Sequence, residues 1–208
     1  MNFFRIRANK NRLAASVTME RDWERNVRSQ DESDWVRQAA QGDREAFARL
    51  VDRYWERVRR WLYGLTGKAQ LAEDVSQEAF LKAWTSLPTL KHADTFRVWL
   101  FRIARHCWLD ARRRSHSDLK LPMPIDVPAT GSGPLNELIS DETLEQLQLA
   151  LAELPSKYRA AYLLWTHEEL PYAEIAEILG VNEETARWRV CKARQGLVET
   201  MTPYLSVS

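Results

Sequence analysis

The residues in this chain best suited to contacting another molecule are basic and aromatic, and they gather in two short stretches. Between residues 96 and 114 there are six arginines and one aspartate, and between residues 187 and 194 there are four basic residues and no acid. Arginine and lysine contact phosphate groups, and an exposed indole or imidazole can stack on an unpaired base. These residue types indicate non-covalent binding to nucleic acid.

The second stretch lies in a segment, 172–194, that predicts two helices joined by a tight turn. Ile175, Ala176 and Leu179 share one side of the first helix. Gly180 follows as a residue that adopts a left-handed turn at little cost, and Asn182 is a good N-cap for the second helix. The buried side of the second helix consists of Ala186, Val190, Ala193 and Leu197. A basic outward face on such a helix is typical of a DNA-binding helix-turn-helix, although a helical hairpin with a solvated face is the alternative.

A polar patch lies on a predicted helix at 71–87. Asp74, Gln77 and Glu78 are spaced at i, i+3 and i+4, so they form one compact face, and Leu81 lies in the middle of it. An apolar residue inside a polar rim is the pattern of a protein interface, and a solvated helix face with one stray leucine is the alternative. A metal or catalytic site is less favoured, because no histidine stands at a helical spacing to these acids and no second carboxylate helix is evident. We therefore predict no enzyme activity and no cofactor.

The periodicity of the whole chain is helical. No segment alternates as a half-buried strand does, so the sequence predicts an all-α protein. Asp34 is expected to open the folded part, and Gly42-Asp43 to separate a short helix from a long amphipathic one. The helix at 96–114 has a core stripe of Phe96, Leu100, Ile103, Ala104, Cys107 and Ala111. Its far side is expected to expose Trp99, Arg102, Arg105, His106 and Arg113. The alternative for Trp99 is that it folds back into the core.

Composition divides the chain into two helical domains. Residues 1–33 lack a sustained period and are predicted to be a flexible extension. Residues 115–140 contain four prolines and two glycines, which indicates a flexible linker. The predicted domains are therefore 34–114 and 141–208, and the second contains the helix-turn-helix.

Composition also argues against a membrane-spanning, secreted or disulfide-bonded protein. The chain has 208 residues and a net charge of +1, and it has no apolar run long enough to span a membrane. The basic start lacks an apolar segment of the secretory kind, and two isolated cysteines fit a reducing cytoplasm. Cys107 is expected to be a buried hydrophobe. For Cys191 an incidental surface position is favoured over the hypothesis of a redox switch near Arg187 and Arg194.

Three segments together resemble a known family. AEDVSQEAFLKAW (72–84), FRVWLFRIARHCWLDARRR (96–114) and LPSKYRAAYLLWTHEELPYAEIAEILGVNEETARWRVCKAR (154–194) are similar, in this order, to the successive signatures of bacterial sigma factors. Two domains with a linker and no middle domain resemble the extracytoplasmic-function (ECF) group. The match covers residues 34–201.

The resemblance implies a transcription initiation factor with a role for each group of residues. The face formed by Asp74, Gln77, Glu78 and Leu81 would bind the β′ clamp helices of core RNA polymerase. The unpaired −10 promoter strand would be captured by Lys91, His92, Thr95, Trp99, Arg102, Arg105 and His106. The −35 element would be read by Thr185, Arg187, Trp188, Arg189 and Lys192. The other implied partners are the polymerase β flap and an anti-sigma factor.

The chain departs from the family pattern at two places. His92 stands where the family usually has glycine. The recognition helix starts with Asn182-Glu183-Glu184, where the family often has Pro-x-Gly. Two acids at a helix N-terminus favour the helix and weaken it as a phosphate site, and Trp188 replaces a small residue on the DNA-facing side. We therefore expect an unusual −35 sequence or a changed docking angle.

Three other functions explain these residues less completely. A stand-alone helix-turn-helix regulator leaves the Asp74 face and the Trp99 helix unexplained. An enzyme acting on nucleic acid lacks a catalytic constellation, and an interaction adaptor leaves both basic helices without a role.

Overall fold

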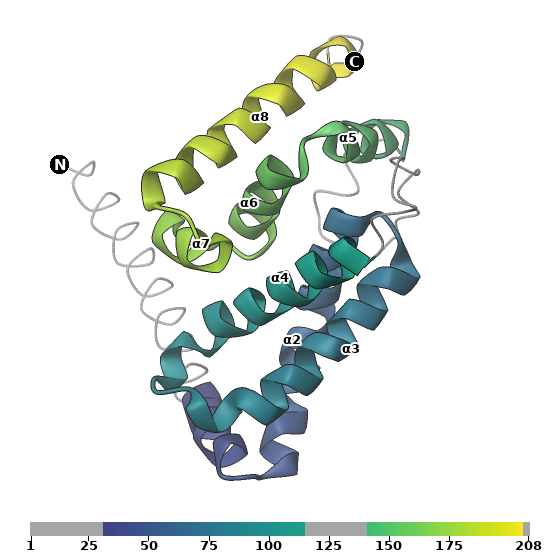
Figure 1. The fold of residues 1–208 in the computed structure, drawn as a ribbon. Helices are drawn as coiled ribbons and strands as arrows, with labels where there is room; N and C mark the ends of the chain where they lie inside the picture. The colour runs from purple at the N-terminus through teal and green to yellow at the C-terminus, as the bar shows by residue number, and fades with distance from the viewer. Residues whose placement is uncertain (1–30, 115–140, 206–208) are drawn as a thin grey trace, which may run out of the picture.

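The computed structural model describes residues 31–114 and 141–205, and the regular elements in these ranges are helical (Figure 1). Residues 31–40 form a first helix. The first half continues with α2 (Arg44–Thr66), α3 (Ala69–Ser86), the short 3₁₀ turns η1 (Leu87–Thr89) and η2 (Ala93–Thr95), and α4 (Phe96–Arg114). The second half contains α5 (Asp141–Glu153), α6 (Ser156–His167), α7 (Tyr172–Leu179) and α8 (Glu183–Leu205). The predicted all-α class is confirmed, and none of the described helices is long and apolar enough to cross a membrane.

The predicted extension and linker fall largely outside the described residues. The exception is 31–33, which are already helical, so Asp34 lies inside the first helix and does not cap it. Its carboxylate instead accepts a hydrogen bond from Arg37 at 2.5 Å. The true cap is Asp43, whose Oδ1 accepts from the backbone N–H groups of Glu45 and Ala46 at 2.9 and 3.1 Å. Asp43 therefore starts α2, as the Gly42-Asp43 interruption indicates.

The first half is a three-helix bundle of α2, α3 and α4. The core stripe predicted for α4 is buried apart from Ile103, which is half-buried, and Cys107 is fully buried as expected. Aromatic pairs join α2 to α4: the ring centroids of Tyr54 and Phe96 are 5.6 Å apart, and those of Trp61 and Phe101 are 5.5 Å apart. Each large apolar side chain buried in this way stabilises the fold by about 1.5–3 kcal/mol.

The second half contains the predicted helix-turn-helix. α7 ends at Gly180, which has φ 59° and ψ 44°, the left-handed conformation that a residue without Cβ adopts most easily. The Asn182 side chain then accepts from the backbone N–H of Thr185 at 2.7 Å and starts α8. The predicted apolar side of α8 is buried in full.

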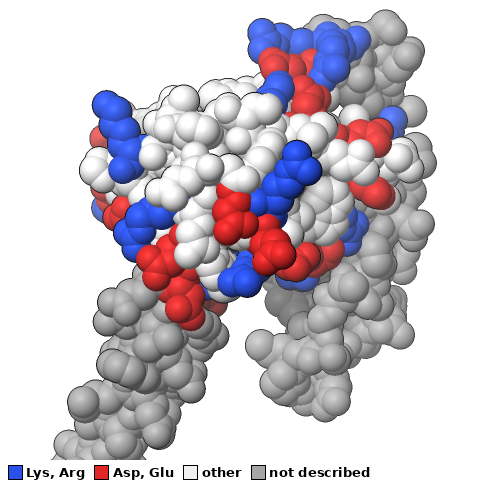
Figure 2. Space-filling view, turned by 90° about the horizontal axis from the view of Figure 1, so that it is seen from below, with Lys and Arg blue, Asp and Glu red and all other residues white. Residues whose placement is uncertain are grey.

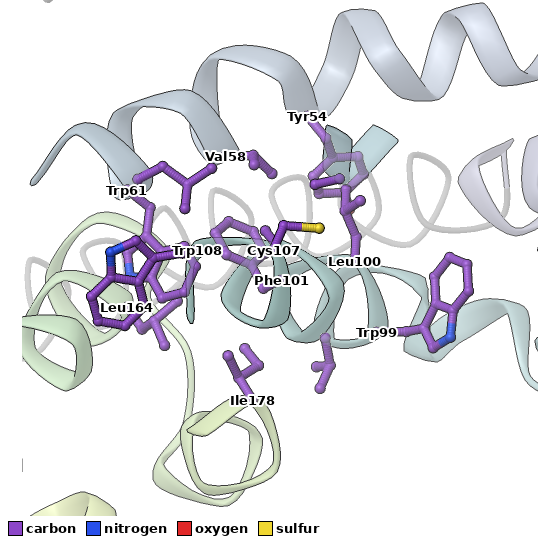
Figure 3. Packing of buried hydrophobic residues seen from close by; sticks show 14 of the residues in the cluster. Tyr54, Val58, Trp61, Trp99, Leu100, Phe101, Cys107, Trp108, Leu164 and Ile178 are labelled. Carbon is purple, nitrogen blue, oxygen red and sulfur yellow. The ribbon is translucent and has the colours of Figure 1, made fainter. Parts of the chain in front are cut away.

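The two halves share one hydrophobic core. α4 packs against α7, and α2 packs against α6 (Figure 1). Figure 3 shows Trp61, Trp108 and Leu164 side by side, with Ile178 of α7 on the side of α4 opposite Val58. The α2 backbone lies against the Leu163 side chain at Gly64, where an added Cβ would lie 2.5 Å from a methyl carbon of Leu163. Consequently α4 is covered by α2 and α3 on one side and by α7 on the other.

Candidate protein and nucleic-acid interfaces

The predicted acidic face of α3 lies at the surface. Asp74 and Gln77 are exposed, and Leu81 is the most exposed large hydrophobic side chain in the described part of the chain, at 68%. Glu78 is half-buried and forms ion pairs with Lys82 at 2.7 Å and Arg114 at 3.0 Å. The hydrogen bond from Lys82 lowers the pKa of Glu78 most, so this carboxylate stays charged. The face thus has the apolar centre and polar rim expected of a protein interface.

A hollow of about 520 Å³ adjoins this face and extends it beyond the predicted residues. Its lining consists of Arg44, Phe47, Gln77, Phe80, Leu81 and Trp84. The rings of Phe47 and Trp84 pack at a tilt of 56°, with their centroids 4.8 Å apart, and this contact joins α2 to α3. Helical spacing does not predict that Phe47 and Trp84 meet, because no helical period within α3 links Trp84 to a residue of α2. Figure 2 shows the lower end of the molecule, where acidic and basic side chains alternate around an uncharged area.

The loop before α4 presents its predicted residues to solvent. Lys91 and His92 are exposed, and Thr95 is half-buried. The Thr95 hydroxyl donates to the backbone carbonyl of His92 at 2.8 Å, and its N–H donates to the same oxygen at 3.1 Å. The Thr95 side chain therefore holds the loop in a turn and does not point freely outward.

The predicted basic face of α4 is partly covered, and His106 and Arg113 are its exposed members. Trp99 is only 8% exposed and packs beside Phe96, with ring centroids 5.9 Å apart, so the expectation of an exposed indole was wrong. Arg102 donates to Glu177 of α7 at 3.2 Å. Arg105 is half-buried; burial lowers its pKa most, and Arg189 of α8 lowers it further. His106 stays exposed, and its pKa is lowered by partial burial and then by the two neighbouring arginines.

The predicted recognition residues of α8 divide into two groups. Arg187, Trp188 and Lys192 are exposed, whereas Thr185 and Arg189 are half-buried. The Trp188 ring meets Tyr158 of α6 edge-on at 5.5 Å and remains 47% exposed. Arg187 pairs with Glu183 at 3.1 Å, and Lys192 donates to Gln195 at 3.1 Å. The exposed group forms an outward basic face.

The remaining candidate residues form no metal or disulfide site in the described ranges. No group of three or more His, Cys, Asp or Glu side chains in 31–114 and 141–205 could hold a metal ion. Cys107 is buried, and burial raises its thiol pKa, while Cys191 is exposed on α8.

Comparison with known proteins identifies the two halves separately. Residues 50–117 match the family model for sigma-70 region 2, and residues 144–197 match the model for sigma-70 region 4. These segments are the α2–α4 bundle and the helices that include the helix-turn-helix.

Relatives with both halves are similar over most of their length. The ECF RNA polymerase sigma factor SigW of Bacillus subtilis is 30% identical over 172 residues, which are 78% of this chain and 92% of SigW. The ECF RNA polymerase sigma factor SigE of Mycolicibacterium smegmatis is 35% identical over 192 residues, which are 84% of this chain and 74% of SigE.

Solved structures share the fold. CnrH in complex with the cytosolic domain of CnrY matches with a TM-score of 0.64 and 23% identity, over 83% of this chain and 98% of that chain. The sigma factor RpoE in complex with the anti-sigma factor NepR, from Bartonella quintana, has a TM-score of 0.64 and 24% identity, over 75% of this chain and 96% of that chain. Both family models match in order along the chain, and SigW is 30% identical over 92% of its own length. The chain therefore belongs to the ECF RNA polymerase sigma factors.

Proposed function

We propose that this protein is a transcription initiation factor that binds core RNA polymerase, directs it to promoters with −10 and −35 elements, and promotes melting of the −10 duplex. It works in the cytoplasm, where the polymerase is, and performs no covalent chemistry itself. Promoter melting is driven by differential binding, because holding an unstacked base in a pocket repays an unstacking cost of a few kcal/mol.

The observation that supports polymerase binding best is the exposed face on α3. Leu81 is 68% exposed beside an aromatic hollow, and Asp74 and Gln77 stand at its rim. A partner that covers this leucine and the adjoining aromatic side chains removes apolar surface from water, which favours binding. The polymerase β′ clamp helices are the partner proposed for this surface.

DNA binding is proposed for exposed residues of both halves. The exposed Lys91, His92 and His106 remain candidates for the −10 strand, and Arg187, Trp188 and Lys192 remain candidates for the −35 element. Trp99 is better assigned to the core of the −10 domain, where it positions α4 and does not stack on a base. A stand-alone DNA-binding regulator is not favoured, because it gives the α3 face no role.

A single substitution tests this proposal. Leu81→Asp places a charge at the centre of the proposed interface, and we expect it to weaken binding to core RNA polymerase by at least about tenfold, as a central anchor does. The measurement is fluorescence anisotropy of the labelled protein titrated with core polymerase.

The matched control is Val198→Asp, because Val198 is a 64% exposed apolar residue on α8. It should bind like the wild type. Equal affinity of Leu81→Asp and the wild type would refute the assignment of the α3 face, and failure of the wild type to bind would refute the function.

A further inference from the structure

The helix α8 carries a large apolar side chain on its outward face. Trp188 lies in the second turn of α8 and remains 47% exposed. Because Ala186 and Val190 are buried, helical geometry places Trp188 on the opposite side of α8, between the exposed Arg187 and Lys192. The indole therefore adds apolar surface to a face whose neighbouring side chains supply positive charge.

A tyrosine of α6 supports this indole. The rings of Trp188 and Tyr158 meet edge-on, with their centroids 5.5 Å apart and an angle of 77° between their planes. Tyr158 is half-buried, and the Nζ atom of Lys157 lies 4.9 Å from the centroid of its ring. The aromatic contact favours one orientation of the indole before a ligand arrives, so binding costs less side-chain entropy.

The place of Trp188 on α8 is that of a base-reading residue. In a helix-turn-helix, residues near the start of the second helix face base edges in the major groove, and basic side chains contact phosphates. The apolar group that base edges present in the major groove is the C5-methyl group of thymine. An indole that covers this methyl group removes apolar surface of both partners from water, which favours a thymine at that position.

We infer that Trp188, supported by Tyr158, recognises the C5-methyl group of a thymine in the −35 element. The inference rests on the proposed function, because it specifies the base that one of the −35 candidates reads. It also gives the replacement of a small residue by Trp188 a definite consequence, a requirement for thymine at one position of the element.

Deoxyuridine tests this inference, because uracil differs from thymine only in lacking the methyl group. The −35 element is first identified by selecting, from a randomised pool, the DNA that core polymerase binds together with the full chain. Each thymine of that element is then replaced singly by deoxyuridine, and the affinity of the complex for each duplex is measured by competition. We expect a loss of about fourfold at one position, the effect of one buried methyl-sized group, and little change at the others.

Variants of the protein assign that loss to the indole. Trp188→Ala should bind the thymine and the deoxyuridine duplex equally well at the sensitive position, whereas Trp188→Phe keeps a ring and should retain part of the preference. Tyr158→Ala should reduce the preference and Tyr158→Phe should keep it, because the contact with Trp188 is made by the ring. The matched control is Val198→Ala, which shortens another exposed apolar side chain of α8 outside the helix-turn-helix and should keep the full preference.

A preference for thymine that is confined to one position and disappears in Trp188→Ala supports the inference. The inference is overturned if the selected −35 element contains no thymine or if no thymine responds to deoxyuridine. It is also overturned if Trp188→Ala weakens binding to both duplexes by the same factor, because the indole would then contact something other than the methyl group. Failure of the proposed function looks different: core polymerase and the protein would select no common DNA element.

Discussion

At the scale of single residues, the pair of Arg57 and Glu168 shows how the two halves are fixed together. Arg57 of α2 donates from Nε at 2.8 Å and from Nη2 at 2.5 Å to the Glu168 carboxylate, which follows α6. The Glu168 side chain is only 3% exposed, whereas Arg57 is one-third exposed. Burial raises the pKa of Glu168, and Arg57 opposes that rise. Arg57, from the other half of the chain, is therefore the main group that favours the charged form of this buried carboxylate.

Replacing Arg57 should lower the free energy of unfolding by an amount that depends on pH. A raised pKa in the folded state means that the folded protein binds the proton more tightly than the unfolded chain, whose value is near 4.5. The protonated Glu168 carboxyl therefore makes its whole contribution to stability below pH 4.5. That contribution is lost as the pH rises through the pKa that Glu168 has in the folded protein. Arg57→Met raises that value further, so we expect a loss of about 3 kcal/mol near neutral pH and a smaller loss near pH 5. Urea unfolding at the two pH values measures it.

The control for this prediction removes both charges. Arg57→Met/Glu168→Gln leaves no buried carboxylate, so its stability should differ from the wild type by a similar amount at both pH values. An Arg57→Met loss that is equal at both pH values would show that Glu168 does not respond to its partner.

At the scale of elements, α4 differs most from its prediction. Its bounds and its main apolar stripe follow from period and composition, but Val98, Trp99, Phe101 and Trp108 are buried as well. A residue outside the main stripe becomes buried only when another element covers it. Here α4 also contacts α7, which lies beyond the 115–140 segment, and no periodicity within α4 reveals that contact. The same reason explains why Leu163, Leu164 and Ile178 were not predicted as interface residues.

The burial of Trp99 gives this difference an experimental consequence. Trp99→Ala removes an indole that is 8% exposed beside Phe96 and should destabilise the protein by about 3 kcal/mol. Trp188→Ala removes an indole that is 47% exposed and should cost less than about 1 kcal/mol. Urea unfolding of the two variants makes the comparison. If both variants lost less than about 1 kcal/mol of unfolding free energy, Trp99 would have to lie at the surface, where it could stack on a base.

Much of the architecture was nevertheless accessible from the sequence. The helix-turn-helix follows from local signals, since Gly180 and Asn182 define its turn and four spaced apolar residues define its buried side. The exposed Leu81 face follows from helical spacing. Contacts between α2, α4, α6 and α7 depend on the path of the chain in space, so neither the aromatic hollow nor the covered arginines could be inferred from spacing.

At the scale of the whole molecule, the shared core couples the stability of the two halves. Leu163, Leu164 and Ile178 are buried in one cluster with residues of α2 and α4. A fragment of residues 141–208 would expose part of that surface. We expect its free energy of unfolding to be at least about 2 kcal/mol lower than that of the same helices in the full chain, the contribution of one buried leucine or isoleucine. Hydrogen exchange at the α7 amides compares them.

Equal protection of α7 in the fragment and in the full chain would show that the halves contribute nothing to each other.

The central claim is that the chain directs core RNA polymerase to particular DNA sequences. The most direct measurement is transcription by core polymerase from a pool of randomised DNA templates, with and without this protein, followed by sequencing of the RNA 5′ ends and of their templates. With the protein, we expect a discrete set of start sites that share two upstream sequence elements at a fixed separation, one for each DNA-binding half. The same distribution of start sites with and without the protein would contradict it.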